Sequence, residues 1–196
     1  MTDARLQAYL GLLFRWNPGA HLTAFRDPKE AAARGVEPSL AALPLLPEAG
    51  AVLDVGSGGG FPAVPLALAR PDLRFTLCEP APKKAAFLRE AARALSLPLE
   101  VEERSAQELL GEGAGPFAAA TARGVRLRRP LVKKILGAVI PGGRLLVWTG
   151  GETLPVYRGL LAAAGFEALE ERPLAEGSTL LSGAVPRGTT FSGSPG

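Results

Sequence analysis

The chain has 196 residues, of which 47% are hydrophobic and 21% are charged, and its formal net charge is +3. This composition is sufficient for one α/β domain with a substantial core and argues against disorder. No apolar run reaches the roughly 20 residues that a membrane span needs. The N-terminus has neither the apolar core nor the cleavage site of a signal peptide. We therefore expect a soluble cytoplasmic protein with no membrane association.

A single cysteine, Cys78, excludes an internal disulfide, and a single histidine, His21, excludes a zinc site of the usual kind. We expect no metal. Cys78 falls in an expected strand, so we interpret it as a small buried hydrophobic residue rather than a nucleophile. His21 lies in the N-terminal region, which we expect to be far from the glycine-rich turn described below.

The first 50 residues are expected to form a helical extension. Apolar residues recur at helical spacing over residues 3–16, which predicts an amphipathic helix with Thr2 as its N-cap. Asn17-Pro18-Gly19 is expected to end this helix. Further helices are expected from about Pro28 to Arg34 and over Leu40–Leu46. The apolar face of the first helix is formed by Leu6, Tyr9, Leu10, Leu13 and Trp16.

From residue 51 onward, expected strands alternate with expected helices. Ala51–Val55 is a short apolar run that predicts a buried strand, and the turn after it contains Gly56, Gly58 and Gly60. A helix is expected from about Phe61 to Ala69. Glycines allow the sharp turn and the close approach of a ligand, as at the nucleotide-binding end of an open α/β sheet.

The residues around this turn indicate which ligand it binds. A dinucleotide fingerprint has a third small residue at the position that Phe61 occupies. The carboxylate of Asp54 suits a cationic amino-acid group better than a pyrophosphate. The spacing Asp54-x-Gly56-x-Gly58-x-Gly60 is similar to motif I of class I S-adenosylmethionine (AdoMet) methyltransferases. A plain strand–helix turn is the alternative interpretation.

The second expected strand, Arg74–Glu79, ends in an acidic residue. In a doubly wound fold this position meets the ribose hydroxyls of the ligand, so Glu79 is a candidate ribose-binding residue. A solvent-facing glutamate is the alternative. Pro82 starts the next helix, and a third strand is expected over Leu99–Glu103. The loop after it lies beside the adenine pocket in this architecture, so it supplies three further ligand candidates, Ser105, Ala106 and Gln107.

The rest of the chain continues the alternation and then departs from it. We expect a fourth strand over Phe117–Thr121 beside the first, a fifth over Arg144–Trp148, and a helix over Leu154–Ala164 that ends at Gly165. Two consecutive strands, Glu167–Pro173 and Ser178–Pro186, predict an antiparallel hairpin. The predicted fold is α/β and Rossmann-like, with a mostly parallel seven-stranded sheet and added N-terminal helices. We expect a single domain over 1–196, with a core at 51–187 and a flexible tail at 188–196.

A strongly basic segment follows the fourth strand. Six of the twelve residues from Arg123 to Lys134 are cationic and none is acidic. A phosphate-bearing substrate would be attracted to such a segment, whereas a solvated helix face is the alternative. The candidate RNA-binding residues are Arg126, Arg128, Arg129, Lys133 and Lys134.

The chain resembles the GidB/RsmG family, the glucose-inhibited division protein B, a 16S rRNA guanine-N7 methyltransferase. The resemblance runs from about residue 10 to 185 and is most specific in the run Leu53–Pro62, which ends in Gly-Phe-Pro. Ala122-Arg123 stands where the family has its arginine–alanine pair. The other matching stretches are Trp16-Asn17, Leu22-Thr23, Arg26-Asp27-Pro28, Arg34 to Ser39, Pro65, Arg70-Pro71 and Lys83-Lys84 through Phe87-Leu88.

The resemblance implies a class I methyltransferase that uses AdoMet, and a ribosomal RNA substrate in the small ribosomal subunit. Guanine N7 has a lone pair in its neutral form, so methyl transfer to it requires no general base. Arg123 is implied to contact phosphate or base as a catalytic and cofactor-binding residue. The implied cofactor site also contains Asp54, Gly56, Ser57, Gly58, Gly60, Phe61 and Glu79. We expect a monomer.

Four positions depart from the family pattern. Gly35 and Pro38 replace a histidine and an aspartate, Gln107 replaces a glutamate, and Thr149 replaces a lysine. The residues expected to bind the cofactor therefore match the family pattern better than those expected to bind the substrate. An AdoMet methyltransferase acting on a small molecule or protein, a non-catalytic RNA-binding relative, and a nicotinamide dehydrogenase are the alternatives.

Overall fold

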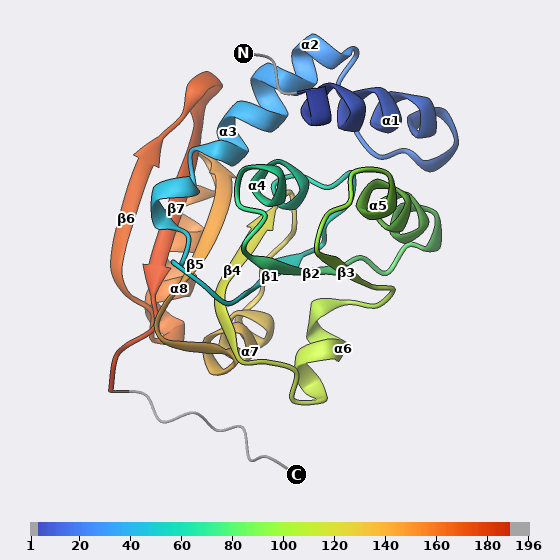
Figure 1. Ribbon diagram of the computed structural model, residues 1–196. Coiled ribbons are helices and arrows are strands. Elements are labelled where there is room, and N and C mark those ends of the chain that lie inside the picture. Colours follow the sequence, from blue (N-terminus) through green and yellow to red (C-terminus); the bar gives the residue numbers. More distant parts are fainter. Residues whose placement is uncertain (1–3, 189–196) are drawn as a thin grey trace.

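The computed structural model describes residues 4–188. Its centre is a seven-stranded sheet with the strand order β3-β2-β1-β4-β5-β7-β6 (Figure 1). The five strands from β3 to β5 are parallel to their neighbours, whereas β7 is antiparallel to both β5 and β6. The strands are β1 (Ala51–Val55), β2 (Arg74–Cys78), β3 (Leu99–Glu102), β4 (Phe117–Arg123), β5 (Val139–Gly150), β6 (Glu167–Pro173) and β7 (Ser178–Ala184).

Helices cover both faces of the sheet. In Figure 1, α1, α4 and α5 lie on one side of it, and α6 and α7 lie on the other. Because each crossover between parallel strands carries a helix, both faces of the sheet are covered, and the central strands β1 and β4 are mostly apolar, with Asp54 and Thr121 as buried polar residues. The helices are α1 (Ala4–Ala20), α2 (Pro28–Ala31), α3 (Glu37–Leu40), α4 (Ala63–Ala69), α5 (Pro82–Ala94), α6 (Ala106–Gly111), α7 (Arg129–Ala138) and α8 (Leu154–Ala164).

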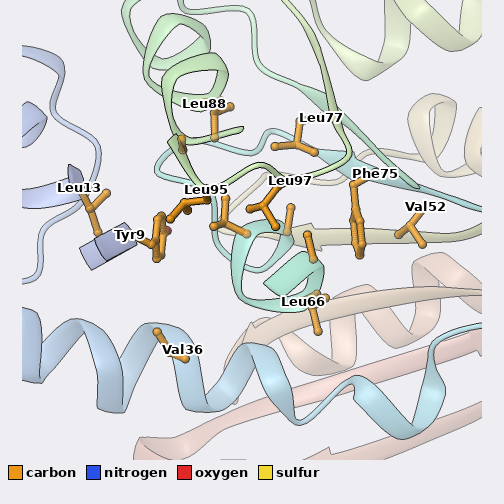
Figure 2. Packing of buried hydrophobic residues seen from close by; sticks show 14 of the residues in the cluster. Tyr9, Leu13, Val36, Val52, Leu66, Phe75, Leu77, Leu88, Leu95 and Leu97 are labelled. Atoms are coloured by element: carbon orange, nitrogen blue, oxygen red, sulfur yellow. The ribbon is translucent and has the colours of Figure 1, made fainter. Parts of the chain in front are cut away.

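The hydrophobic core consists of two clusters, one on each face of the sheet. In the first, Tyr9 and Leu13 of α1 pack with Leu66 of α4, Leu88 of α5 and Phe75 of β2 (Figure 2). The second cluster joins α6, α7 and α8 to the opposite face. Side chains alternate between the faces along a strand, so β1 contributes to both clusters and is buried on both sides.

The central strands confirm the expected sheet. β1 has the predicted bounds, and it pairs with β4 on one side and β2 on the other. The C-terminal hairpin is also confirmed, and Gly165 ends α8 with a φ of 109°. β4 is longer than expected and reaches Arg123, and β5 extends in both directions, from Val139 to Gly150. None of the helices that the structure describes is long and apolar enough to cross a membrane.

The expected end of the first helix is wrong. α1 continues through Pro18 to Ala20. A proline this near the end of a helix removes only one of the last hydrogen bonds, so the backbone stays helical for a further turn. The side chain of Asn17 organises the residues beyond the helix instead, because its Oδ1 accepts hydrogen bonds from the backbone N–H groups of Leu22 and Thr23 at 2.8 and 2.9 Å. The proposed cap Thr2 lies outside the described residues.

The second and third expected helices are also bounded differently. Helix α2 continues without a break into a π-helical turn, Ala32–Val36, and then into α3. Of the expected helix over 40–46, Leu40 is the last residue of α3 and Leu43–Leu45 forms a single 3₁₀ turn. A π-helical turn depends on contacts that neighbouring elements make with it, so the periodicity of the sequence does not reveal it. The tail proposed at 188–196 lies almost wholly outside the described residues.

Candidate functional site

The turn after β1 is built from glycines in the left-handed region. Gly56, Gly58 and Gly60 have φ values of 67°, 54° and 92°, which other residues rarely adopt. A Cβ atom on Gly56 would lie 2.5 Å from a methyl group of Val125. The chain therefore requires glycine at position 56 both for its conformation and for the close approach of the loop after β4.

Asp54 lies in β1, directly beneath this turn, and is almost fully buried. Its Oδ1 accepts a hydrogen bond of 2.6 Å from the hydroxyl of Thr121 on β4. Its Oδ2 is buried and accepts no hydrogen bond from the described residues. Burial raises the pKa of Asp54 to about 6, against the nearby hydroxyl groups of Ser57 and Thr121, which lower it. An unsatisfied buried carboxylate oxygen indicates a missing cationic or N–H partner.

Glu79 follows β2 and is also buried. Its two carboxylate oxygens accept hydrogen bonds of 2.9 Å from the backbone N–H groups of Gly58 and Ala81. Each oxygen keeps a second lone pair for another donor. Glu79 therefore holds the glycine turn in place. Its carboxylate stands directly after β2, where the sequence predicts an acidic residue that binds the ribose.

A cleft with a volume of about 510 Å³ opens over this turn, and we call it the glycine-turn cleft. Its floor is formed by Gly56–Gly59 and Glu79, and its rim by the loop after β4 and by the N-terminal segment. The cleft lies at the carboxyl ends of β1, β2 and β4, where open α/β sheets bind their ligands. The remaining lining residues are Leu22, Thr23, Phe25, Phe61, Pro80, Lys84, Arg123, Gly124 and Val125.

Arg123 ends β4 and binds the N-terminal segment. Its guanidinium donates hydrogen bonds to the carbonyl of Gly35 at 2.8 Å, to Ser39 Oγ at 3.3 Å and to the carbonyl of Arg34. Its Cζ also lies 5.9 Å from the centre of the Phe61 ring. Burial lowers the pKa of Arg123 from its usual value. Arg123 thus ties the π-helical turn to the cleft and contributes a charge to the cleft wall.

The aromatic residues around Phe61 form the support of the cleft on the N-terminal side. The Phe61 ring meets Tyr9 and Phe25 edge to face, with centroid distances of 5.5 and 5.8 Å. The Tyr9 hydroxyl donates a 2.6 Å hydrogen bond to the carbonyl of Gly59. Burial raises the pKa of Tyr9 well above its usual range, so the hydroxyl keeps the proton that it donates.

The N-terminal segment around His21 reaches the glycine-turn cleft, which the sequence did not indicate. Leu22, Thr23 and Phe25 line the cleft within four residues of His21, although His21 itself is exposed and does not line it. Sequence reasoning missed these residues, together with Tyr9 and Val125. No local signal marks them, because they reach the turn only through tertiary packing.

The basic segment divides into three parts. Arg123 lines the cleft, and Lys134 is half-buried and donates to the carbonyl of Gln107 at 3.1 Å. The remaining cations, Arg126, Arg128, Arg129 and Lys133, are exposed and form no ion pair with any residue from 4 to 188. They lie in the loop after β4 and on the first turns of α7, next to the cleft rim. Their charge is therefore uncompensated.

The three candidates after β3 lie outside the cleft lining. Ser105 is the N-cap of α6, and its hydroxyl and Glu108 form a capping box. Ala106 is buried, and Gln107 contributes its carbonyl to Lys134. The sequence signal at these positions is therefore accounted for by helix capping in this structure.

For three of the four residues that depart from the family pattern, the structure shows which neighbours they contact. A Cβ atom on Gly35 would lie 2.7 Å from the Phe61 ring, so the aromatic cluster occupies the space of a larger side chain there. The carbonyl of Pro38 accepts a 2.7 Å hydrogen bond from the indole of Trp148. Thr149, at the end of β5, shares a 2.5 Å hydrogen bond with Thr153 at the start of α8.

Cys78 is buried in β2, as expected. Burial raises the pKa of its thiol to about 12, so it remains protonated and unreactive. Within residues 4–188, no three His, Cys, Asp or Glu side chains are grouped as metal ligands would be.

Comparison with solved structures shows a shared fold. An O-methyltransferase family protein from Burkholderia thailandensis aligns with a TM-score of 0.66 at 18% identity, over 96% of this chain and 75% of its own. A 16S rRNA methyltransferase of T. thermophilus, solved in complex with AdoMet and guanosine, aligns with a TM-score of 0.60 at 17% identity. That alignment covers 76% of this chain and 41% of the other. At these identities the likeness concerns the fold, which is that of class I methyltransferases.

Comparison of sequences shows the family. A relative from Leptothrix cholodnii, named ribosomal RNA small subunit methyltransferase G, is 42% identical over 76% of this chain and 69% of its own length. A protein of the same name from Stenotrophomonas maltophilia is 40% identical over 86% of this chain and 78% of its own. The family model described as rRNA small subunit methyltransferase G matches residues 2–171. The chain therefore belongs to the rRNA small subunit methyltransferase G (GidB) family.

Proposed function

We propose that this protein transfers a methyl group from AdoMet to N7 of a guanine in 16S ribosomal RNA. The observation that carries the proposal is the glycine-turn cleft, lined by the buried carboxylate of Glu79 and with that of Asp54 buried beneath its turn, in a chain of this family. A ribosomal substrate also places the protein in the cytoplasm, where the small subunit is assembled.

The residues in and directly beneath the cleft fit AdoMet. Oδ2 of Asp54 is buried without a partner, and an ammonium group is the kind of cation that would satisfy it, directly or through a water molecule. Glu79 has lone pairs for ribose hydroxyls, and Gly56 and Gly58 expose backbone where side chains would obstruct a ligand. The cleft volume of about 510 Å³ lies within the range of small-molecule sites.

AdoMet supplies an electrophilic methyl group on a sulfonium. The chain's own residues then need to orient the two reactants in line and exclude water, because N7 of neutral guanine already has an exposed lone pair. Among the described residues that line the cleft, Glu79 is the one carboxylate, and it is engaged with the glycine turn; Asp54, beneath the turn, accepts a hydrogen bond from the neighbouring strand. Positioning therefore supplies the catalysis, with Arg123 at the cleft wall in contact with base or phosphate.

The exposed cations after β4 support an RNA substrate. Arg126, Arg128, Arg129 and Lys133 are exposed, form no ion pair within residues 4–188 and follow the cleft residues Arg123–Val125 in the chain, so they would attract the phosphate backbone beside the reacting base. In folded RNA, base edges are accessible mainly in loops and other unstacked regions. We therefore expect the target guanine to be an unstacked nucleotide.

The cofactor half of the proposal is tested by calorimetric titration with AdoMet. The wild-type protein should bind AdoMet, and Glu79→Gln should weaken binding about tenfold or more because it removes a charge-assisted acceptor from the ribose. Asp72→Asn is the matched control, since Asp72 is an exposed acid that pairs with Arg70 outside the cleft. No heat of binding with the wild-type protein at millimolar AdoMet would contradict the proposal.

A further inference from the structure

A second pocket opens between the C-terminal part of α1 and the start of α5, and we call it the tryptophan pocket. The two helices lie side by side in Figure 1. The volume of the pocket is about 380 Å³, which lies within the range of small-molecule sites. Its lining combines one aromatic residue, two cations and two small residues, namely Trp16, Arg15, Lys83, Gly19 and Ala20.

Trp16 uses only part of its side chain for packing. Its ring lies against that of Phe87 on α5, with 6.0 Å between the ring centres and 60° between the planes. The residue is half-buried, and its indole N–H makes no hydrogen bond to any residue from 4 to 188. The indole of Trp148, in contrast, is buried and donates to the carbonyl of Pro38. The partly open indole of Trp16 is therefore available to a ligand.

The two cations of the pocket come from different helices. Arg15 and Lys83 are both exposed, and neither forms an ion pair with a residue that the structure describes. The Nζ atom of Lys83 donates a hydrogen bond of 3.3 Å to the carbonyl of Gly19.

The charges at the start of α5 oppose the helix itself. The helix begins Pro82-Lys83-Lys84 and has no acidic residue in its first turn. Two lysines at this end face the positive end of the helix dipole, so their charges are unfavourable for the helix. An anionic ligand at this position would compensate for both.

The tryptophan pocket adjoins the glycine-turn cleft on the side of β2. Lys84, the residue after Lys83, lines the cleft, and so does Leu22, two residues after Ala20. Helix α5 follows β2, whereas the basic segment follows β4, and β1 lies between these two strands in the sheet. Cations that form no ion pair within the described residues therefore flank the cleft on two sides.

We propose that the tryptophan pocket binds a nucleotide of the RNA strand next to the target guanine, with its base stacked on Trp16 and its phosphates bound by Arg15 and Lys83. This inference rests on the proposed function. Single-stranded RNA binds where bases stack on aromatic side chains and cations follow the phosphate backbone. The strand would cross the cleft from the basic segment to this pocket. The target guanine itself stays in the cleft, and the pocket holds a neighbour of it.

The fluorescence of Trp16 tests the stacking. The chain has two tryptophans, and the buried Trp148 is shielded from RNA. A short single-stranded RNA that contains guanine, added with S-adenosylhomocysteine present, should quench the emission of the wild-type protein but not that of Trp16→Phe. Trp16→Leu, which lacks an aromatic face, should bind this RNA about 5- to 150-fold more weakly, whereas Trp16→Phe should keep most of the affinity. Unquenched wild-type emission at saturating RNA would overturn the inference.

The salt dependence of RNA binding tests the two cations. Replacing Arg15 and Lys83 with alanine should reduce the slope of log affinity against log salt by about 1.4, because each contact with a single strand contributes about 0.7. The matched control replaces Arg89 and Arg93, which lie on α5, pair with glutamates and do not line the pocket. A wild-type slope in the first double variant would contradict the assignment.

A free nucleotide and an assembled subunit distinguish RNA from other occupants. A nucleoside monophosphate should quench Trp16 only at concentrations far above those of the RNA, since it lacks the strand that continues into the cleft. Quenching at equal concentrations would contradict a strand that spans both sites. Trp16→Leu that methylates naked small-subunit RNA at the wild-type rate but assembled subunits slowly would show that the pocket binds a protein, which also overturns the inference.

The two proposals can fail separately. If the wild-type protein methylates guanine in RNA and Trp16→Leu binds RNA with wild-type affinity, the assignment of the pocket is wrong and the proposed function stands. If the wild-type protein methylates no guanine, the proposed function is wrong, and the quenching by RNA still decides whether the pocket binds it. AdoMet affinity should be unchanged in every variant, and thermal unfolding shows whether each remains folded.

Discussion

At the scale of single residues, Asp54 is a carboxylate in an environment that disfavours its charge, at the position where the proposed ligand presents an ammonium group. Its burial favours the neutral form, while binding of an ammonium requires the ionised one. An unfavourable environment of this kind is retained at functional sites because the bound ligand compensates for its cost. Two consequences can be measured, one on stability and one on cofactor affinity.

We predict that Asp54→Asn changes how stability depends on pH. The pKa of Asp54 is about 6 in the folded protein and therefore above that of an aspartate in the unfolded chain. The folded state holds the proton more tightly, so the free energy of unfolding falls as pH rises from about 4 to 6 and stays lower above that. In urea unfolding, the free energy of unfolding of Asp54→Asn relative to that of the wild type should therefore rise by about 2–3 kcal/mol from pH 4 to pH 7.

Asp72→Asn provides the control for the sign of this effect. The hydrogen bond from Arg70 lowers the pKa of Asp72, so its contribution to stability is present above its unfolded pKa and is lost as pH falls through its folded one. The free energy of unfolding of Asp72→Asn relative to that of the wild type should therefore not rise between pH 4 and pH 7. An Asp54→Asn variant whose stability relative to wild type is the same at both pH values would contradict the prediction.

The same carboxylate should make cofactor binding dependent on pH. We predict that AdoMet affinity of the wild-type protein falls as pH drops below about 6, because the neutral carboxyl no longer attracts an ammonium. Calorimetric titrations at pH 5 and pH 7.5 measure this, and Asp54→Asn should be weak at both. Wild-type affinity that is unchanged between the two pH values would count against a role of Asp54 in binding.

Residues such as Asp54 and Glu79 could be predicted from the sequence because they are fixed relative to a strand end and a glycine turn. Their partners could not. Thr121 comes from a different strand, and the N–H of Gly58 reaches Glu79 only after β1 and β2 pair. Val125 was missed for the same reason, since its contact with Gly56 requires the loop after β4 to fold back over the turn.

At the scale of elements, the N-terminal segment is part of the site rather than a cover over the sheet. Leu22 and Phe25 line the cleft, and the π-helical turn Ala32–Val36 gives two carbonyl groups to Arg123. The strands and the later helices followed from periodicity and turn residues. The continuous helical stretch from α2 to α3 did not, because it depends on contacts with Arg123 and Trp148 far along the chain.

We predict that Arg123→Lys loosens this segment. A lysine keeps the charge but cannot span the carbonyls of Arg34 and Gly35 and the hydroxyl of Ser39 together. The free energy of unfolding should fall by about 2–3 kcal/mol. Hydrogen exchange should become faster over residues 32–40 and remain unchanged in the central strands. Unchanged exchange over residues 32–40 would show that Arg123 does not hold the segment.

The contact between the N-terminal segment and the glycine turn can be tested with a pair of glycines. A Cβ atom on Gly59 would lie 2.7 Å from the carbonyl oxygen of Leu22, whereas one on Gly58 has no atom nearer than 3.9 Å. Gly58→Ala should cost about 1–2 kcal/mol through its left-handed backbone alone. Gly59→Ala should instead move the segment, with faster hydrogen exchange at residues 20–25. Exchange there that matches Gly58→Ala would argue against the contact.

At the scale of the whole molecule, the exposed cations after β4 and the glycine-turn cleft are neighbours. The glycine-turn cleft lies at the carboxyl ends of β1, β2 and β4, and the exposed cations follow the cleft residues Arg123–Val125 in the loop after β4 and the start of α7. The sequence alone indicated the fold and this face, because strand ends and the basic segment are local features. It did not indicate that Leu22, Thr23 and Phe25 of the N-terminal segment line the cleft, because they reach it only through tertiary packing.

We predict that the cations after β4 account for a large part of RNA affinity. Replacing Arg126, Arg128 and Arg129 with alanine should weaken RNA binding and reduce the slope of log affinity against log salt by about 2, since each contributes about 0.7 to 0.9. Arg158→Ala with Arg172→Ala is the control, because both arginines pair with glutamates of β6. A triple variant with the wild-type salt slope would refute an RNA-binding role for this segment.

The measurement that tests the central claim most directly is the mapping of the methylated atom. Unmodified small-subunit ribosomal RNA is incubated with the purified protein and isotopically labelled AdoMet, then digested to nucleosides and analysed by mass spectrometry. The proposed function predicts label in 7-methylguanosine at a single unstacked guanine, and its loss with Asp54→Asn. Label in another base, on another atom of guanine, or nowhere in the RNA while AdoMet binds would contradict it.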